Sequence, residues 1–275
     1  MNYRLAAGLV AAMLTGIGAA PQEGSDAKDL LKKGLETSAA EGGFTFTGTV
    51  EQESPFGGGA MVIGGPGFSV GPDGKCAGTL GSDGVVHVRL EKEKNVYELF
   101  RKGSKTVHRQ VWSGRQLASG SFAGEASAAL DLARLSKAAS KSRDVKKDGE
   151  KKVGDVDCVA IKATLPSDIV ESEESGEGPA GIEFKMFELN RVEATFYFGK
   201  DDHILRKAEY KFVKGFNSAV RMAGAGGDED EDEDEDGGGG PVKASFSTTF
   251  NLTLGAFSKT ASVTVPDDVK GLLKD

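Results

Sequence analysis

Hydrophobic and polar positions alternate with a period of two over much of this chain. In the first such segment Phe44, Phe46, Gly48 and Val50 share one face, and threonines occupy the other. A segment that is apolar on one side and polar on the other is typical of a half-buried β-strand. The same pattern predicts further strands over 85–90, 96–100, 106–112, 153–165, 192–198, 204–212, 246–254 and 261–265.

Two segments carry a helical period instead. Residues 25–41 place Leu30, Leu31 and Leu35 on one stripe, behind a serine that can cap the helix. Residues 125–141 are rich in alanine and present a broad apolar stripe that suits packing on a sheet. Since consecutive strands joined by short turns pair antiparallel, the sequence predicts an α+β fold in which helices cover an antiparallel sheet.

Residues 1–20 have the composition of an export signal. One basic residue, Arg4, precedes an uncharged run of 16 residues that ends in small residues at Ala19 and Ala20, as secretory signals do. The run is shorter than the roughly 20 residues of a membrane-spanning helix, although an uncleaved anchor is the alternative. We expect residues 21–275 to form one domain with no transmembrane span, because no linker-like stretch or second long apolar run interrupts them.

The acidic charge of the chain is concentrated in one segment. The formal net charge is −8, and nine consecutive acidic residues begin at Asp228 and end at Asp236. Without this run and without Arg4, the remaining 33 basic and 33 acidic residues balance, which indicates no bias toward nucleic acid. Glycines flank the run, so we expect a disordered, solvated loop over about 217–242. Weak binding of a divalent cation or of a basic partner is the alternative role for these carboxylates.

The chain has two cysteines, Cys76 and Cys158. In an exported protein such a pair favours a disulfide, and closing a loop of roughly 80 residues would stabilise the fold by about 4 kcal/mol. The alternative is two separate buried thiols. Two distant thiols without nearby histidines make a poor metal site, so we expect no bound metal.

No segment has the pattern of a catalytic site. Residues 67–71 match the G-x-S-x-G motif of hydrolases around Ser69, but turn-forming glycine and proline stand on both sides, where the mechanism needs a strand and a helix. His87, His108 and His203 form no closely spaced pair, and we expect each to be solvated. The chain also lacks phosphate-binding and dinucleotide-binding motifs. The sequence therefore predicts a protein that is not an enzyme and has no cofactor.

Several features follow one another in a distinctive order. Residues 25–41 and the strand that includes Phe44 are followed by Val-Gly-Asp-Val-Asp-Cys at 153–158, an aromatic hairpin around 196–207, and an alternating strand that ends at Pro266. This order resembles the LolA/LprG-like superfamily of envelope lipoprotein carriers, the outer-membrane lipoprotein-sorting proteins. The resemblance implies a half-open antiparallel β-barrel or curved sheet covered by two or three helices, with an apolar cavity that takes acyl chains.

The resemblance also implies which residues line the cavity. The inward aromatic and aliphatic rows of the predicted strands would contact the ligand, namely Phe44, Phe46, Phe196, Phe198, Phe250 and Leu252. The alternative is that these rows pack against the helices as ordinary core. Two features depart from the family's pattern, because no lipid-modified cysteine ends the export signal and the acidic run is an insertion.

These observations predict an exported protein, periplasmic or secreted, of a bacterial cell envelope. Its expected function is the non-covalent binding of a lipid or of lipoprotein acyl chains, which is driven by burial of apolar area and needs no catalytic residue. The alternative is an interaction or sensor module of the same fold with a filled core, which contacts an envelope protein through its loops.

Overall fold

The computed structural model describes residues 23–53, 74–92, 95–110, 116–117, 121–170, 187–216 and 245–274. The predicted export signal (1–20), Ser69 and the segment predicted as an acidic loop (217–242) lie outside these residues. The helices of the described part are α1 (Glu23–Ala40), α2 (Ser121–Leu130), α3 (Leu132–Ala139), α4 (Asp267–Lys270) and the short 3-10 helix η1 (Ser167–Ile169). Its strands are β1 (Gly43–Glu53), β2 (Gly74–Leu80), β3 (Val86–Lys92), β4 (Asn95–Lys102), β5 (Lys105–Gln110), β6 (Gln116–Leu117), β7 (Arg143–Val153), β8 (Val156–Leu165), β9 (Phe187–Gly199), β10 (Leu205–Phe216) and β11 (Ser245–Ser258).

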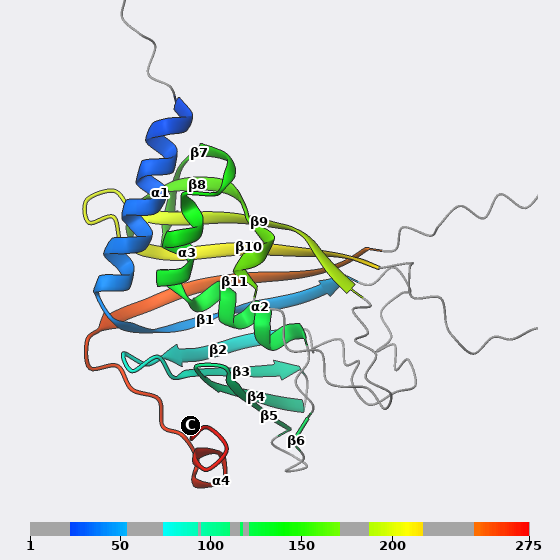
Figure 1. Ribbon diagram of the computed structural model, residues 1–275. Coiled ribbons are helices and arrows are strands. Elements are labelled where there is room, and N and C mark those ends of the chain that lie inside the picture. Colours follow the sequence, from blue (N-terminus) through cyan, green and yellow to red (C-terminus); the bar gives the residue numbers. More distant parts are fainter. Residues whose placement is uncertain are drawn as a thin grey trace, which may run out of the picture.

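All these strands belong to one antiparallel sheet, in the order β6-β5-β4-β3-β2-β1-β11-β10-β9-β8-β7 (Figure 1). Strands that follow one another in sequence pair with one another, except β6 and β7, and the first and last strands meet at the centre of the sheet. There β1 pairs with β11, with Val50 opposite Phe250. Since β6 and β7 stand at opposite ends of this order, the sheet is curved but not closed. The predicted α+β class and half-open, curved antiparallel sheet are confirmed.

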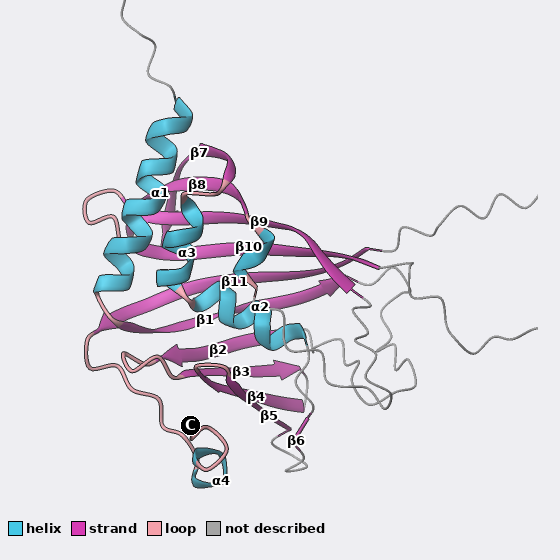
Figure 2. Ribbon diagram, in the orientation of Figure 1, coloured by secondary structure: helices cyan, strands magenta, loops and turns pink. Residues whose placement is uncertain are grey.

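Helices α1, α2 and α3 cover one face of the sheet, which we call the inner face, and the opposite face is the outer face (Figure 2). α1 contacts α3, β7 and β10, and α2 contacts α3. The main core lies between these helices and the sheet, and its leucines include Leu31 and Leu35 of α1 and Leu132 and Leu135 of α3. Each fully buried leucine contributes about 1.5–3 kcal/mol relative to an exposed one, so α1 and α3 are firmly attached.

The attachment of α1 depends on one glycine and one serine. A Cβ atom at Gly34 would lie 2.5 Å from the ring of Phe198, so only glycine lets the helix approach the sheet this closely. One turn further on, the buried Ser38 hydroxyl donates to the Gly34 carbonyl at 2.7 Å and accepts from the Leu205 backbone N–H at 2.8 Å. This hydroxyl therefore joins α1 directly to β10 with no unpaired polar atom.

Two predicted elements differ in the structure. The helix predicted over 125–141 is two helices, because Asp131 interrupts it and caps α3 by accepting a hydrogen bond from the Arg134 backbone N–H at 2.9 Å. The strand predicted over 261–265 is wrong, since this segment joins no sheet and leads into α4. Its alternating valines, Val263 and Val265, do make apolar contacts. They pack against the outer face of the sheet, and the segment forms no strand of the sheet.

Strands β2 and β7 were not predicted, for two different reasons. β2 has the sequence GKCAGTL, in which glycines and alanine obscure the alternation. β7 is an edge strand whose side chains are almost all exposed, so its sequence RDVKKDGEKKV carries no buried face. The period-two pattern arises only where one face of a strand is buried.

The predicted disulfide between Cys76 and Cys158 is wrong, because both residues are buried free thiols. Cys76 lies in β2 and belongs to the main core, whereas Cys158 lies in β8 in a separate cluster with Ala160 and Tyr197. Four strands stand between β2 and β8 in the sheet, which corresponds to about 24 Å along it. A disulfide requires Cα atoms within about 7 Å. Burial raises the pKa of Cys76 to about 11, so this thiol stays protonated.

Candidate ligand site on the inner face

The six residues predicted to line a cavity all lie buried in the main core. Phe44 and Phe46 come from β1, Phe196 and Phe198 from β9, and Phe250 and Leu252 from β11, and none is more than 3% exposed. Their burial in one core agrees with the alternative reading, in which they are packing residues. Whether they also contact a ligand stays a prediction.

Two aromatic residues that were not predicted as part of the site connect several of the others. Tyr210 contacts Phe196 edge to face, with ring centroids 5.6 Å apart, and stacks on Phe212 at 6.1 Å. Phe212 in turn contacts Phe250 at 5.7 Å. The inner face of β9, β10 and β11 therefore carries one continuous aromatic cluster. Phe44 and Phe46 form a separate pair, at 6.5 Å, nearer the other end of β1.

The inner face changes from apolar to polar along β10, β11 and β1. Residues that stand opposite one another on these strands form rows, and successive rows are about 7 Å apart because side chains on one face recur every second residue. In order, the rows are Tyr210–Phe250–Val50, Phe212–Thr248–Gln52 and Lys214–Phe246. We call the last two rows, with the Tyr210 hydroxyl and Glu125 of α2, the polar end of the inner face.

Apart from the carboxylate of Glu125, which pairs with the ammonium of Lys214, two buried oxygen atoms at the polar end have no hydrogen-bond partner within the described part of the chain. One is the hydroxyl of Tyr210, a residue that is 1% exposed, and the other is the side-chain carbonyl oxygen of Gln52. Burial raises the pKa of Tyr210 well above its usual range, so its hydroxyl is neutral and can donate as well as accept. An unpaired buried polar group costs about 1–3 kcal/mol, and such groups are rare in folded proteins. Polar groups of a ligand would satisfy these atoms.

The charged groups of the polar end neutralise each other. Lys214 and Glu125 form an ion pair, and their side chains are only 14% and 1% exposed. Burial raises the pKa of the Glu125 carboxyl, and the ammonium of Lys214 opposes that shift. Separating α2 from β10 would leave a buried charge without its partner, which is strongly unfavourable. The ion pair therefore holds α2 against β10.

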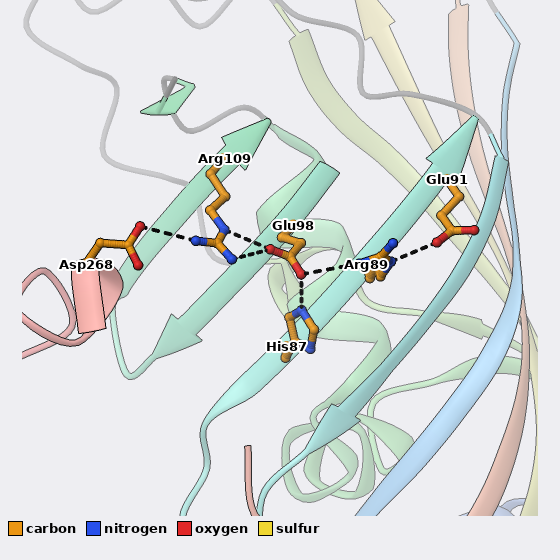
Figure 3. Close-up of polar contacts among 6 residues, drawn as sticks. All are labelled: His87, Arg89, Glu91, Glu98, Arg109 and Asp268. Atoms are coloured by element: carbon orange, nitrogen blue, oxygen red, sulfur yellow. Dashed lines mark hydrogen bonds and ion pairs between the residues drawn. The ribbon is translucent and has the colours of Figure 1, made fainter. Parts of the chain in front are cut away.

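A second polar cluster lies on the outer face, across β3, β4 and β5 (Figure 3). Its centre is Glu98, which is 9% exposed. Arg109 donates to Glu98 Oε2 from Nε and also contacts it through Nη2, both at 2.7 Å. His87 Nε2 lies 3.3 Å and Arg89 Nη1 3.9 Å from Glu98 Oε1. Both carboxylate oxygens therefore have cationic or hydrogen-bonding partners.

This outer-face cluster fastens the C-terminal segment to the sheet. Arg109 also reaches Asp268 of α4, with 3.2 Å between Nη1 and Oδ2. Beside this contact Phe100 and Val107 pack against Val269 and Leu273, so the segment closes over the outer face of β4 and β5 (Figure 3). The ring of His87 stacks on Phe100, with centroids 4.5 Å apart. Every group shown serves packing or pairing, which makes this cluster a structural clamp.

The three histidines do not share the solvated state that the sequence predicts. His87 is paired with Glu98, and burial lowers its pKa while the carboxylate of Glu98 opposes the shift. His108 lies on the inner side of β5 opposite Leu99, and its Nε2 is buried without a hydrogen-bond partner among the described residues. Burial lowers its pKa to about 4. Only His203, in the turn before β10, is in a partly exposed position of the kind expected.

Metal ions, small pockets and membrane-spanning helices would define other kinds of site. No group of three or more histidine, cysteine and acidic side chains gathers there in a way that could hold a metal ion. A polar hollow of about 100 Å³ lies beside β7, β8 and β9, which is smaller than the pockets of roughly 300–1,000 Å³ that hold organic ligands. None of the described helices combines the length and the apolar composition needed to cross a membrane. The hollow is lined by Asp144, Lys146, Lys162, Ala163, Thr164 and Glu193.

The sequence also carries a signal for the polar end. Gln52 continues the inward row of Phe44 to Val50, and Lys214 continues the inward row of Tyr210 and Phe212. A polar side chain at an inward position of an otherwise apolar row breaks the alternation and therefore indicates a candidate binding site. Glu125 breaks the apolar stripe of its helix in the same way.

Comparison with known proteins gives similarity at the level of structure. No protein-family model matches the sequence, and no curated protein matches it. Similar solved structures include LprF from Mycobacterium bovis (13% identity, 88% of this chain and 97% of that chain covered, TM-score 0.41) and the Mycobacterium tuberculosis lipoprotein LppX (10%, 86% and 99%, 0.41). A LolA-superfamily protein from Nitrosomonas europaea is also similar (11%, 88% and 96%, 0.29). At identities and TM-scores this low, the similarity assigns neither a family to this chain nor a role to any of its side chains.

Proposed function

We propose that this protein is an exported, non-catalytic binding protein for lipids or lipoprotein acyl chains. In this proposal residues 1–20 are the export signal, residues 21–275 are the mature domain, and the protein works in the periplasm or outside the cell. The acyl chain would lie on the inner face, against the aromatic cluster of β9, β10 and β11. Binding would gain its free energy from the burial of apolar area and would need no reacting group.

The unpaired hydroxyl of Tyr210 is the observation that carries this proposal. It lies 1% exposed in an aromatic cluster, without a hydrogen-bond partner in the described part of the chain. A core selected for stability alone would carry phenylalanine here, as it does at Phe212 two residues later. A tyrosine whose hydroxyl is unpaired is explained if a bound molecule supplies the partner.

α2 is the element that we expect to move when a ligand enters. Its buried apolar residues include Ala126, Ala128 and Ala129 beside Leu130, whereas α1 and α3 each bury two or more leucines. Because stabilisation scales with the apolar area that is buried, a helix attached mainly by alanines is the least costly to displace. Its movement would uncover the polar end, where Glu125 meets Lys214.

The test is native mass spectrometry of the mature protein purified from an envelope fraction, followed by organic extraction. We expect a co-purifying lipid of defined mass. We also expect Tyr210→Phe to retain less of it, with Tyr97→Phe as the control because Tyr97 lies in β4, away from the aromatic cluster. Protein that carries no lipid, and that takes up no fluorescent acyl probe after extraction, would contradict the proposal.

The second candidate function is an interaction or sensor module of the same fold with a filled core. The observation in its favour is that the six predicted lining residues are all buried among packing partners. Such a module would bind an envelope protein through its loops, and the acidic run that begins at Asp228 would attract a basic partner or, weakly, a divalent cation. A lipid-free protein that captures a basic partner only while this run is intact would favour this function.

A further inference from the structure

The polar end of the inner face also indicates the chemical class of the ligand's polar group. This inference rests on the proposed function, because it assumes that an apolar ligand binds on the inner face. The two unpaired atoms are a phenolic hydroxyl, which donates and accepts, and an amide oxygen, which accepts. A ligand hydroxyl or amide can accept from Tyr210, and another hydroxyl or amide of the same ligand can donate to Gln52. A carboxylate or phosphate has no proton for the Gln52 oxygen.

The charges at the polar end lead to the same ligand class. The ammonium of Lys214 would be the natural partner of an anionic head group, but Glu125 already occupies it. The Glu125 carboxylate, for its part, would repel an anion and is not free to pair with a cationic head group. A buried charge without a partner is far more costly than a buried neutral group with hydrogen bonds, so either kind of ionised head group would be disfavoured.

We infer that the ligand presents uncharged, hydrogen-bonding polar groups, such as the hydroxyls of an acylglycerol, to Tyr210 and Gln52. The neighbouring row Tyr210–Phe250–Val50 contacts the part of the ligand's acyl chain that is nearest to the head group. The ion pair between Glu125 and Lys214 acts as a selectivity device, because it removes the free cation that would otherwise hold a fatty acid.

The experiment compares ligands that share one chain and differ only in the head group. Delipidated full-length protein is loaded with the uncharged probe N-phenyl-1-naphthylamine, which is then displaced at neutral pH by 1-monolauroylglycerol, laurate or dodecylammonium. We expect monolauroylglycerol to displace the probe at a concentration at least about tenfold lower than either ionised ligand. Equal or better displacement by laurate would overturn the inference while leaving the proposed function intact. Failure of the probe and of all three ligands to bind would count against the proposed function itself.

A charge variant tests the role of the ion pair directly. Glu125→Gln leaves Lys214 as an unpaired cation, so laurate should gain roughly tenfold in affinity relative to monolauroylglycerol. Glu150→Gln is the matched control, because Glu150 pairs with Lys200 at an exposed position of the β7–β8 hairpin. Should Glu125→Gln fail to fold, Gln52→Leu gives an independent reading, since it removes the acceptor and should weaken monolauroylglycerol alone. If neither variant shifts the preference between the two ligands, the assignment of the head group is wrong.

Discussion

The two buried polar regions of this protein differ in whether their polar atoms have partners. On the outer face, Glu98 pairs with Arg109 and His87, and Arg109 also pairs with Asp268. On the inner face, the Tyr210 hydroxyl and the Gln52 side-chain oxygen are buried without partners in the described structure. A fully paired cluster stabilises the fold, whereas unpaired buried atoms reduce stability and need another explanation. The comparison therefore separates a structural clamp from a candidate binding site.

Breaking the outer-face cluster should have the largest effect on stability. Glu98→Ala removes the common partner of Arg109 and His87 and leaves the Arg109 guanidinium with only its exposed contact to Asp268 among the contacts described. Because Glu98 is only 9% exposed, we expect a loss of about 3–4 kcal/mol in the free energy of unfolding. Urea denaturation measures it, with Glu91→Gln as the control, since Glu91 is 51% exposed and pairs with Arg89 at the surface. A loss below about 1 kcal/mol would show that the cluster is not a clamp.

Lowering the pH should destabilise the protein through His108. Burial lowers its folded-state pKa to about 4 from 6.5, so the unfolded chain takes up the proton first as the pH falls. The contribution of His108 to stability is complete above about pH 6.5 and is lost progressively as the pH falls to about 4. The total loss is about 3 kcal/mol.

Unfolding followed across this pH range in wild-type protein and in His108→Leu measures this contribution. Between pH 6.5 and pH 4 the free energy of unfolding of His108→Leu should fall by about 3 kcal/mol less than that of the wild type. His203→Asn, in the turn before β10, is the control and should follow the wild type. An unchanged pH dependence in His108→Leu would mean that the imidazole is not buried in solution.

Removing the unpaired hydroxyl on the inner face should stabilise the protein without ligand. Tyr210→Phe keeps the ring and its aromatic contacts and eliminates a polar atom that lacks a partner. We expect the free energy of unfolding to rise by about 1 kcal/mol, with weaker binding of an acyl ligand that carries a hydroxyl. Both changes in one variant distinguish a binding residue from a packing residue. A destabilised Tyr210→Phe would indicate that the hydroxyl already has a partner.

Removing the exposed ion pair of the outer-face cluster should have the smallest effect on stability. Asp268 is 69% exposed on its side chain, and its ion pair with Arg109 is accessible to water and salt. Asp268→Asn should therefore cost at most about 0.5 kcal/mol, measured by thermal unfolding at low and high salt. Leu273→Ala, which removes a side chain that is 5% exposed, should destabilise more. The reverse order would mean that charge, and not packing, holds the C-terminal segment.

Strand faces and most elements of the fold could be predicted because they are local properties of the chain. The side-chain period of a strand places Phe196 and Phe198 on one face wherever that strand lies, and all six predicted lining residues are indeed buried together. The exposed edge strand β7 could not be predicted, because without a buried face it has no alternation. The predicted disulfide failed because neither the strand order nor the face on which each thiol lies can be read from spacing.

The sequence by itself determined the α+β class, the faces of the strands and the inward positions of Gln52, Tyr210 and Lys214. Only the tertiary structure decided which polar atoms found partners. Arg109 meets Asp268, and β1 meets β11, across long stretches of sequence. Periodicity follows from the geometry of a few neighbouring residues, whereas pairing depends on which strand lies next to which, and that depends on the whole chain at once.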